Sequence, residues 1–297
     1  YSRFEKILEQ IKFIHKYANK TIETFCMLVT GKTEEGKTTL VDIYSKRFPR
    51  KRDEEGEVIP ILRSLIPAPA SVTSVVERFL EDLGDELPTK GRKSKKTLRL
   101  CNYIKDSKVE LIILDEFQHL IDRESKNVLN EVSDWLKTVI NITKVPVLLL
   151  GMPESKNVLD VNPQLRRRFK LRYKLEPFKI QTKSQKIEFR SFLSVLDSKL
   201  PLKSYLADPD IALRIHYVTE GFVGYIKPLV EMATIIAYSS KDTDEINNKV
   251  LSKAFNEVGE SMILGKKNPF DKKTFTEEDY YSLWKNSYKK NLQEDFK

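Results

Sequence analysis

The chain has few of the residues that build disulfide frameworks, metal sites or membrane spans. Only two of its 297 residues are cysteines and three are histidines, and neither type has the spacing of paired cysteines or of metal ligands. The longest apolar run, residues 145–151, is far shorter than the roughly 20 residues that cross a bilayer. We therefore exclude a disulfide-stabilised secreted domain, and we expect a cytoplasmic protein without membrane contact or signal peptide.

Glycine is also scarce, yet two of the ten glycines fall in one phosphate-binding pattern. Residues 31–38 read Gly-Lys-Thr-Glu-Glu-Gly-Lys-Thr and match G-x-x-x-x-G-K-[ST] at every required position. In such a loop, backbone N–H groups and the next helix face a polyphosphate, the lysine reaches the outer phosphates and the threonine binds Mg²⁺. The residues predicted to bind ATP are Gly31, Lys32, Thr33, Glu34, Glu35, Gly36, Lys37, Thr38 and Thr39.

Two carboxylates stand inside this loop. Glu34 and Glu35 would repel bound phosphates unless their side chains point outward, and the pattern allows this because its variable positions contribute backbone atoms. We expect both to point outward. The alternative interpretation is a glycine-containing turn that opens an ordinary helix.

Apolar strands alternate with amphipathic helices around the loop. This alternation favours an α/β fold with a five-stranded parallel sheet covered by helices on both faces. A helix over residues 2–17 is expected to pack on the first strand. The predicted strands are residues 25–30, 58–62, 110–116, 145–150 and, at an edge, 171–175; the helices between them are residues 38–48, 71–83, 98–105 and 125–141.

Beyond residue 177 the pattern changes to helices only, at residues 184–196, 210–219, 225–238 and 244–257. The aromatic side chains of the tail either dock on the body of the protein or bind a partner. The parts are an α/β nucleotide-binding core with its N-terminal helix (1–178), a small all-α domain (179–262) and a polar C-terminal tail (263–297).

Two acids, Asp115 and Glu116, close the third predicted strand. An acid at the carboxyl end of a buried strand can hold Mg²⁺, and its neighbour can orient or deprotonate an attacking water. Any strand can end in acids, but together with the phosphate loop this pair indicates nucleotide hydrolysis. We assign Thr38 and Asp115 to the metal, and Glu116 and Lys37 to catalysis. A small-molecule kinase is the less favoured alternative.

Three arginines, Arg166, Arg167 and Arg168, lie between the fourth and fifth predicted strands. They could form a solvated face. In a ring or filament, one of them could instead enter the neighbouring subunit's site and stabilise charge on the γ-phosphate, as arginine fingers do. We favour Arg168 for this role, and Arg167 next.

The charge balance is basic, with 52 Lys and Arg against 43 Asp and Glu, and it favours a polyanionic partner without proving one. Residues 90–96 carry five of these positive charges and no acid, in a predicted loop over residues 84–96. Such a run is commonly a solvated face. Its place beside a nucleotide-binding core makes DNA contact the slightly favoured interpretation.

Three blocks of sequence together resemble the TniB/TnsC group of AAA+ ATPases, which regulate DNA transposition. These are Asp115-Glu116-Phe117-Gln118-His119-Leu120, residues 147–151 and residues 164–169; residues 220–226 resemble the start of that group's lid helix. The resemblance implies an ATPase that assembles as a ring or helical filament on double-stranded DNA. It also implies partners: a TniQ-like target-selection protein, in some systems an RNA-guided CRISPR effector, and a DDE transposase of the TnsB/TniA type.

The same resemblance implies where DNA is contacted. The corresponding positions are Thr73, Lys90, Arg92, Lys93 and Lys95, in agreement with the separate charge argument. ATP binding would drive assembly, and hydrolysis would permit disassembly.

Two positions depart from that group's pattern. Met152 stands where a polar residue usually follows the fourth strand, and Tyr225 stands where the lid has an arginine, with Lys227 two positions on. We therefore expect slow hydrolysis with intact nucleotide binding. The alternatives are a signalling or scaffold AAA+ ATPase that binds only protein, and a relative of replication initiators or clamp loaders.

Overall fold

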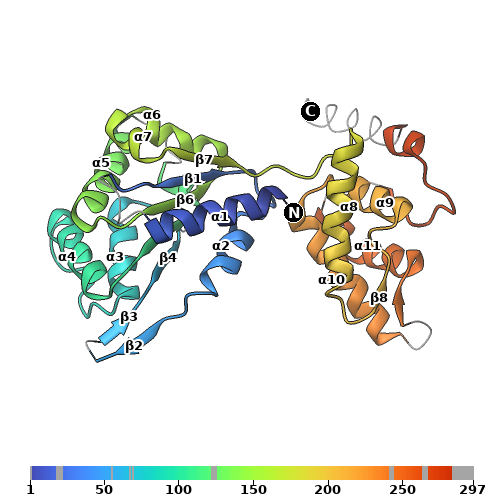
Figure 1. Ribbon diagram of the computed structural model, residues 1–297, viewed down its shortest axis with the longest axis horizontal. Helices are drawn as coiled ribbons and strands as arrows, with labels where there is room; N and C mark the ends of the chain where they lie inside the picture. The colour runs from blue at the N-terminus through green and yellow to red at the C-terminus, as the bar shows by residue number, and fades with distance from the viewer. Residues whose placement is uncertain are drawn as a thin grey trace. The chain divides into compact units, whose positions relative to one another are not determined.

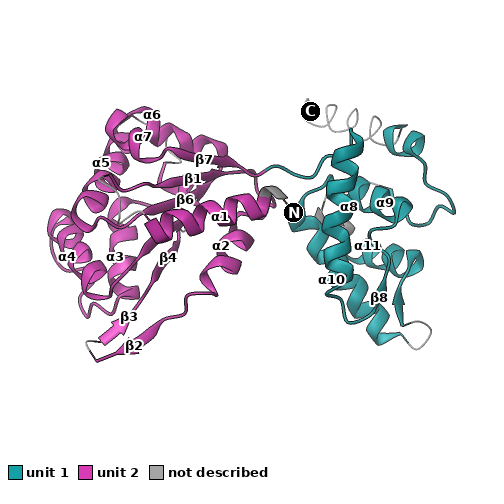
Figure 2. Ribbon diagram, in the orientation of Figure 1, with its two compact units in different colours: residues 1–2, 176–297 teal, residues 3–175 magenta. Residues whose placement is uncertain are grey.

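The computed structural model describes residues 2–17, 23–54, 56–66, 68, 70–121, 126–240, 244–262 and 267–282. They fall into two compact units (Figure 2). Arg3–Leu175 form one unit, and the described residues from Glu176 onward belong to the other. No helix in these described ranges is both long and apolar enough to cross a membrane.

The first unit is built on one parallel sheet of five strands, in the order β4–β5–β6–β1–β7. Strands β1, β5 and β6 are almost entirely buried, while β7 at the edge alternates between half-buried and exposed side chains. The predicted parallel sheet and its edge strand are confirmed. The strands are β1 (Met27–Thr30), β4 (Ile61–Leu65), β5 (Leu111–Asp115), β6 (Val147–Gly151) and β7 (Leu171–Lys174).

Helices cover both faces of this sheet (Figure 1). On one face α1 (Ser2–Tyr17) and α2 (Lys37–Ser45) pack against side chains such as Met27 and Val29. The opposite face, which carries Leu28, is covered by the larger cluster around α3 (Val72–Asp82), α4 (Lys93–Asp106) and α5 (Lys126–Thr143). Short helical turns complete the unit: η2 (Phe117–Leu120), η3 (Pro153–Lys156), α6 (Asn157–Asp160) and α7 (Pro163–Arg168).

The predicted strand at residues 58–62 is wrong in its bounds. The chain first forms an antiparallel hairpin of β2 (Lys51–Asp53) and β3 (Gly56–Val58), and the buried strand β4 begins only after Pro60. Proline has no N–H to donate to a strand ladder, so it separates the two strands. The Pro60 carbonyl is still used, since it accepts a hydrogen bond from the Leu111 N–H at 3.1 Å.

The predicted loop over residues 84–96 is also too long, because α4 already begins at Lys93. The Lys96 side chain is buried against α3, where its ammonium pairs with Glu77. A lysine can bury its aliphatic stem in this way while its charge is paired. Lys93 and Lys95 therefore lie on the first turn of a helix.

The second unit consists mainly of α8 (Lys183–Asp197), α9 (Pro209–Thr219), α10 (Val223–Ser239) and α11 (Asn248–Met262). The expected helical composition is confirmed, with one addition. Strand β8 (Lys203–Ser204) pairs in parallel with β9 (Glu245–Ile246) over two residues each.

Residues 267–282 dock on α9 of this unit. The fully buried Arg214 pairs with Asp210 and donates to the Lys272 carbonyl at 2.9 Å, while its guanidinium faces the Phe275 ring. Phe275 and Tyr280 are buried in the core of the unit. These aromatics of the predicted tail therefore pack on the body of the protein, whereas residues 263–266 and 283–297 of the tail lie outside the described residues.

Candidate functional site

The phosphate loop connects the end of β1 to the start of α2. The Gly31 N–H donates to the Gly151 carbonyl at 3.0 Å, which fastens the loop to the end of β6. Gly36 has a left-handed φ of 88°, which favours glycine, and a Cβ on Gly31 would lie 2.5 Å from Glu35 Oε2, so a larger residue there would displace the Glu35 side chain. Helix α2 begins without a side-chain cap. Its first N–H groups therefore remain available to an anion.

Lys37 lies at the inner side of this loop. Its ammonium donates to the carbonyls of Gly31 and Lys32, both at 2.8 Å, and its side chain is buried. Two of its three N–H donors are thereby used, which leaves one for a phosphate oxygen. Thr38 and Thr39 follow in the first turn of α2 and are exposed.

The two loop carboxylates do not behave alike. Glu34 is exposed and has a left-handed φ of 66°, as the outward prediction requires. Glu35 turns inward instead and is 6% exposed; its Oε2 accepts a hydrogen bond from the Lys32 N–H at 2.7 Å. The outward prediction is wrong for Glu35. Burial raises the pKa of the Glu35 carboxyl, and the Lys32 N–H and nearby lysines oppose this increase.

Asp115 ends β5 with no exposed surface. Its Oδ1 accepts from the Glu116 N–H at 3.0 Å, and its Oδ2 lies 3.2 Å from a guanidinium nitrogen of Arg63 on β4. Arg63 also pairs with Asp42 on α2, so it joins the predicted metal residue to the helix that follows the phosphate loop. Sequence reasoning missed Arg63, although a lone charge within an apolar strand is a signal for a buried partner.

Thr38 and Asp115 offer a hydroxyl and a carboxylate, which are hard oxygen ligands. No cluster of three His, Cys, Asp or Glu that could hold a metal occurs among the described residues. Mg²⁺ is usually held by one or two carboxylates, water and substrate phosphates rather than by an all-protein cage. The donor set therefore fits Mg²⁺ that arrives with a nucleotide and neutralises phosphate charge.

Glu116 follows β5 in a left-handed conformation with φ 56°. Its Oε2 accepts a hydrogen bond from Gln118 Nε2 at 2.5 Å, and Gln118 Oε1 accepts from the Met152 N–H at 3.0 Å. The Met152 sulfur lies 3.9 Å from the Thr33 hydroxyl of the phosphate loop. The ends of β5 and β6 thus meet the loop at one edge of the sheet. No sequence pattern assigns a role to Gln118.

The three predicted arginines lie on α7. The Arg168 guanidinium donates to Asn141 Oδ1 at 2.5 Å within the same chain. Arg166 and Arg167 are exposed, and their guanidinium groups make no ion pair or hydrogen bond with other described residues. Arg167 is thus exposed and Arg168 is bonded within the chain, and which of the two enters a neighbouring subunit's site stays a prediction.

The predicted lid positions lie in the second unit. Tyr225 packs on Phe222 with ring centroids 5.7 Å apart, and Lys227 lies 3.7 Å from Glu231 on the exposed side of α10.

The residues predicted to contact DNA differ in availability. Lys90, Arg92 and Lys95 are exposed, and their side chains have no ion pair with any described residue. Lys93 is already paired with Glu131 at 2.5 Å, and Thr73 is half-buried in the first turn of α3. Basic side chains at a helix N-terminus oppose the helix dipole by about 0.3–1 kcal/mol each. A polyanion would compensate this repulsion at the start of α4.

Arg99 holds the loop before α4 in place. Its guanidinium donates to the carbonyls of Leu87 and Lys90, at 2.8 and 3.2 Å, and lies 2.7 Å from Asp85. The exposed side chains of Lys90 and Arg92 are thus presented from an anchored backbone.

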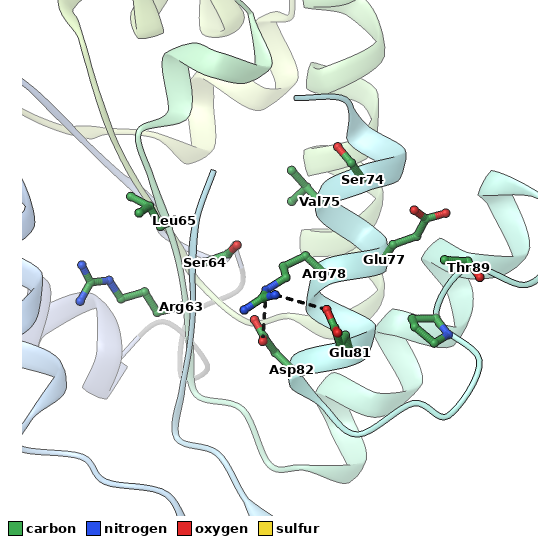
Figure 3. Close-up of a pocket in the computed structure, with 11 residues that line it drawn as sticks. Arg63, Ser64, Leu65, Ser74, Val75, Glu77, Arg78, Glu81, Asp82 and Thr89 are labelled. Atoms are coloured by element: carbon green, nitrogen blue, oxygen red, sulfur yellow. Dashed lines mark hydrogen bonds and ion pairs between the residues drawn. The ribbon is translucent and has the colours of Figure 1, made fainter. Parts of the chain in front are cut away.

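A cavity of about 650 Å³ opens between β4 and α3, and Pro88 and Thr89 also line it (Figure 3). On α3 the Arg78 guanidinium pairs with Glu81 and Asp82, whereas the Arg63 side chain extends to the other side of β4. No phosphate-loop residue is among the described residues that line the cavity, but Arg63, which pairs with Asp115, lines it.

Comparison with known proteins gives one family and a set of related folds. The family model described as bacterial TniB protein matches residues 1–180. No curated protein matches the chain in sequence. Among solved structures, the chain is similar to the Aeropyrum pernix ORC2 protein in its ADPNP-ADP complexes, with 16% identity and a TM-score of 0.60, over 86% of this chain and 68% of that chain.

Two further structures are similar over 86% of this chain at 15% identity. They are Cdc6p from Pyrobaculum aerophilum, with a TM-score of 0.59, and the Aeropyrum pernix ORC1 protein in complex with DNA, with a TM-score of 0.57. This chain spans 66% and 65% of their lengths, which is less than two thirds. At these identities the likeness shows the fold alone.

Proposed function

The chain belongs to the TniB family, and from this membership we propose that it is an ATP-dependent AAA+ regulator of DNA transposition. Subunits bind ATP with Mg²⁺, assemble as a ring or helical filament on duplex DNA, and come apart after hydrolysis. The assembly links a TniQ-like target-selection protein, in some systems with an RNA-guided CRISPR effector, to a DDE transposase of the TnsB/TniA type.

One observation carries this proposal: an uncapped helix N-terminus, a buried lysine and two strand-end acids belong to one edge of the sheet. The loop N–H groups and Lys37 bind the phosphates, and Lys37 stabilises charge on the outer ones. Glu116 orients the attacking water and accepts its proton. Thr38 and Asp115 hold Mg²⁺, which neutralises phosphate charge when bound.

DNA binding is supported by the three available cations at the start of α4. Lys90, Arg92 and Lys95 contact backbone phosphates, whereas Lys93 first has to leave Glu131. The ORC1 structure of similar fold was solved in complex with DNA, which agrees with a DNA-facing role for such a fold.

Subunit contact completes the proposed site. Arg167 from one subunit reaches the γ-phosphate held by its neighbour, so hydrolysis depends on assembly. Arg167→Ala is expected to lower turnover only where subunits associate, and equal loss in dilute, unassembled protein would remove this role.

The central experiment measures duplex DNA binding by fluorescence anisotropy with no nucleotide, with ADP and with a non-hydrolysable ATP analogue, over a salt series. We expect the analogue to be required, and affinity to fall steeply with salt. Lys90→Glu, Arg92→Glu and Lys95→Glu should each weaken binding and reduce the salt slope by about 1. Lys105→Glu, at the exposed far end of the same helix, is the matched control. Equal affinity with and without nucleotide would refute the proposal.

Two variants separate ATP binding from hydrolysis. Lys37→Ala should abolish ATP binding. Glu116→Gln should bind ATP and remain assembled on DNA, because the base is lost while the loop is intact. Normal turnover in Glu116→Gln would remove Glu116 from its assigned role.

The main alternative is a scaffold ATPase that binds only proteins. Its sequence support is the aromatic tail together with the departures at Met152 and Tyr225. Of that tail, Phe275 and Tyr280 are buried in the second unit, so these two side chains do not form an exposed hook. Unchanged function after all three charge reversals at the start of α4 would favour this alternative.

A further inference from the structure

The Gln118 side chain connects two loops at the edge of the sheet that carries the proposed catalytic acid. Its Nε2 donates to Glu116 Oε2 at 2.5 Å, and its Oε1 accepts from the Met152 N–H at 3.0 Å. Each end of the amide has its own kind of partner. Flipping the amide would set its oxygen against the carboxylate and its NH₂ against an N–H, so its orientation is fixed by these partners.

Glycine at the end of β6 leaves room for the Ser155 hydroxyl and for this amide. A Cβ on Gly151 would lie 2.2 Å from Ser155 Oγ, 2.9 Å from Gln118 Oε1 and 3.2 Å from the Gln118 backbone nitrogen. The Gly151 carbonyl in turn accepts the Gly31 N–H of the phosphate loop at 3.0 Å. A short path of contacts therefore runs from the Glu116 carboxylate through Gln118 and the end of β6 to the phosphate loop.

Gln118 is one of two polar side chains beside Gly151 at this end of β6; the other is the buried Ser155. Met152 contributes its backbone N–H there, and its thioether is only a weak acceptor. Glu116 is half-buried, and the Gln118 amide is the side-chain donor to its carboxylate among the described residues.

We propose that Gln118 is a positioning residue for the Glu116 carboxylate. This inference rests on the proposed ATPase function and adds the group that aligns the base. Gln118 holds the Glu116 carboxylate in one rotamer. Because the same amide is bonded to the Met152 N–H, that rotamer depends on the position of the Met152 backbone beside the phosphate loop. Loss of the amide frees the carboxylate to rotate, so fewer encounters with water are productive.

The test is single-turnover ATP hydrolysis with excess protein and duplex DNA, together with ATP affinity and thermal unfolding for each variant. Gln118→Ala should lower the hydrolysis rate about 10- to 100-fold, because misplacement by about 1 Å costs this much. ATP affinity should stay within about two-fold, since the amide does not touch the nucleotide loop directly. Gln10→Ala on α1, a glutamine of the same unit far along the chain from the site, is the control and should match the wild type.

Two readouts separate positioning from a merely structural role. Gln118→Glu places two carboxylates side by side. At lower pH one of them is protonated and can donate a hydrogen bond to the other. The hydrolysis rate of Gln118→Glu should therefore recover relative to the wild-type rate as pH falls. In a Glu116→Gln background, Gln118→Ala should cause no further loss, because the group that it positions is gone. A structural defect would instead lower ATP affinity and unfolding temperature with no change in the pH profile.

The outcomes distinguish this inference from the proposed function. If the wild type hydrolyses ATP, Glu116→Gln does not, and Gln118→Ala equals the wild type, the positioning role is overturned while the function stands. A faster Gln118→Ala variant would also overturn it, because the amide would then restrain Glu116 away from water. A wild type no faster than Lys37→Ala would reject the site itself.

Discussion

Arg63 should be the side chain on which the stability of the site depends most. It lies 3.2 Å from the fully buried Asp115 and also pairs with Asp42, and 24% of its side chain is exposed. Arg63→Met keeps the aliphatic stem but leaves the Asp115 charge without its cation. Removing one partner of a buried pair costs about 3–5 kcal/mol, and the partial exposure of Arg63 places the expected loss near the low end, about 3 kcal/mol.

For a unit of this size, that loss corresponds to an unfolding temperature lower by about 6–12 °C. The assay is urea unfolding followed by tryptophan fluorescence in a Trp284→Phe background, so that Trp135, buried in α5 of the same unit, is the only reporter. Asp115→Asn added to Arg63→Met removes the uncompensated charge. The double variant should therefore recover at least about 1.5 kcal/mol of the loss.

Arg78→Met is the matched control. Arg78 also pairs with two acids, but its side chain is 59% exposed and both partners lie on its own helix. Arg78→Met should therefore lower the free energy of unfolding by no more than about 0.5 kcal/mol. The reasoning is refuted by an Arg63→Met variant as stable as the Arg78→Met control. It is equally refuted by a double variant no more stable than Arg63→Met alone.

Two further predictions concern the backbone and the pH dependence of the same unit. Glu34→Gly should raise the unfolding free energy by about 0.5–1 kcal/mol. Glycine avoids the cost that the left-handed conformation has for an L-residue, and this gain exceeds the stability lost because glycine makes the unfolded chain more flexible. Glu34→Ala is the control and should show no gain. Burial lowers the pKa of His15 from 6.5, against the opposing effect of Glu110, so the folded state disfavours its proton. Its contribution to stability is therefore complete above pH 6.5 and is lost as pH falls below it; urea unfolding from about pH 8 to about pH 5 should show a decline that His15→Gln lacks.

Periodicity predicts the sheet well because the strands are buried on both faces. A run such as residues 147–150 has no polar face to confuse with a helix, and its parallel neighbours have the same character. The phosphate loop and the strand-end acids are also readable, because their positions are fixed by local sequence. The helix start at Lys93 could not be predicted, because the basic residues of the first turn resemble an exposed loop and give no sign that Lys96 is buried and paired with Glu77.

Contacts between distant segments could not be predicted from the sequence. Arg63 meets Asp115 only because β4 and β5 are adjacent in a register that pairs Leu65 with Asp115. Gln118 meets the Met152 backbone because β5 and β6 end at the same edge of the sheet. No local pattern encodes either pairing. The inward turn of Glu35 is similar, because it depends on the free Lys32 N–H and the missing Cβ of Gly31.

The two left-handed glutamates of the site carry the same type of backbone strain for different reasons. Glu34 is exposed, and its side chain makes no ion pair with any described residue, so glycine should replace it at no functional cost. Glu116 has its carboxylate bound by Gln118 just beyond the end of β5, and glycine there would relieve the strain but remove the proposed base. Glu116→Gly should therefore be at least as stable as the wild type yet inactive, whereas Glu34→Gly should be more stable and fully active. An active Glu116→Gly variant would show that the Glu116 carboxylate is not the catalytic base.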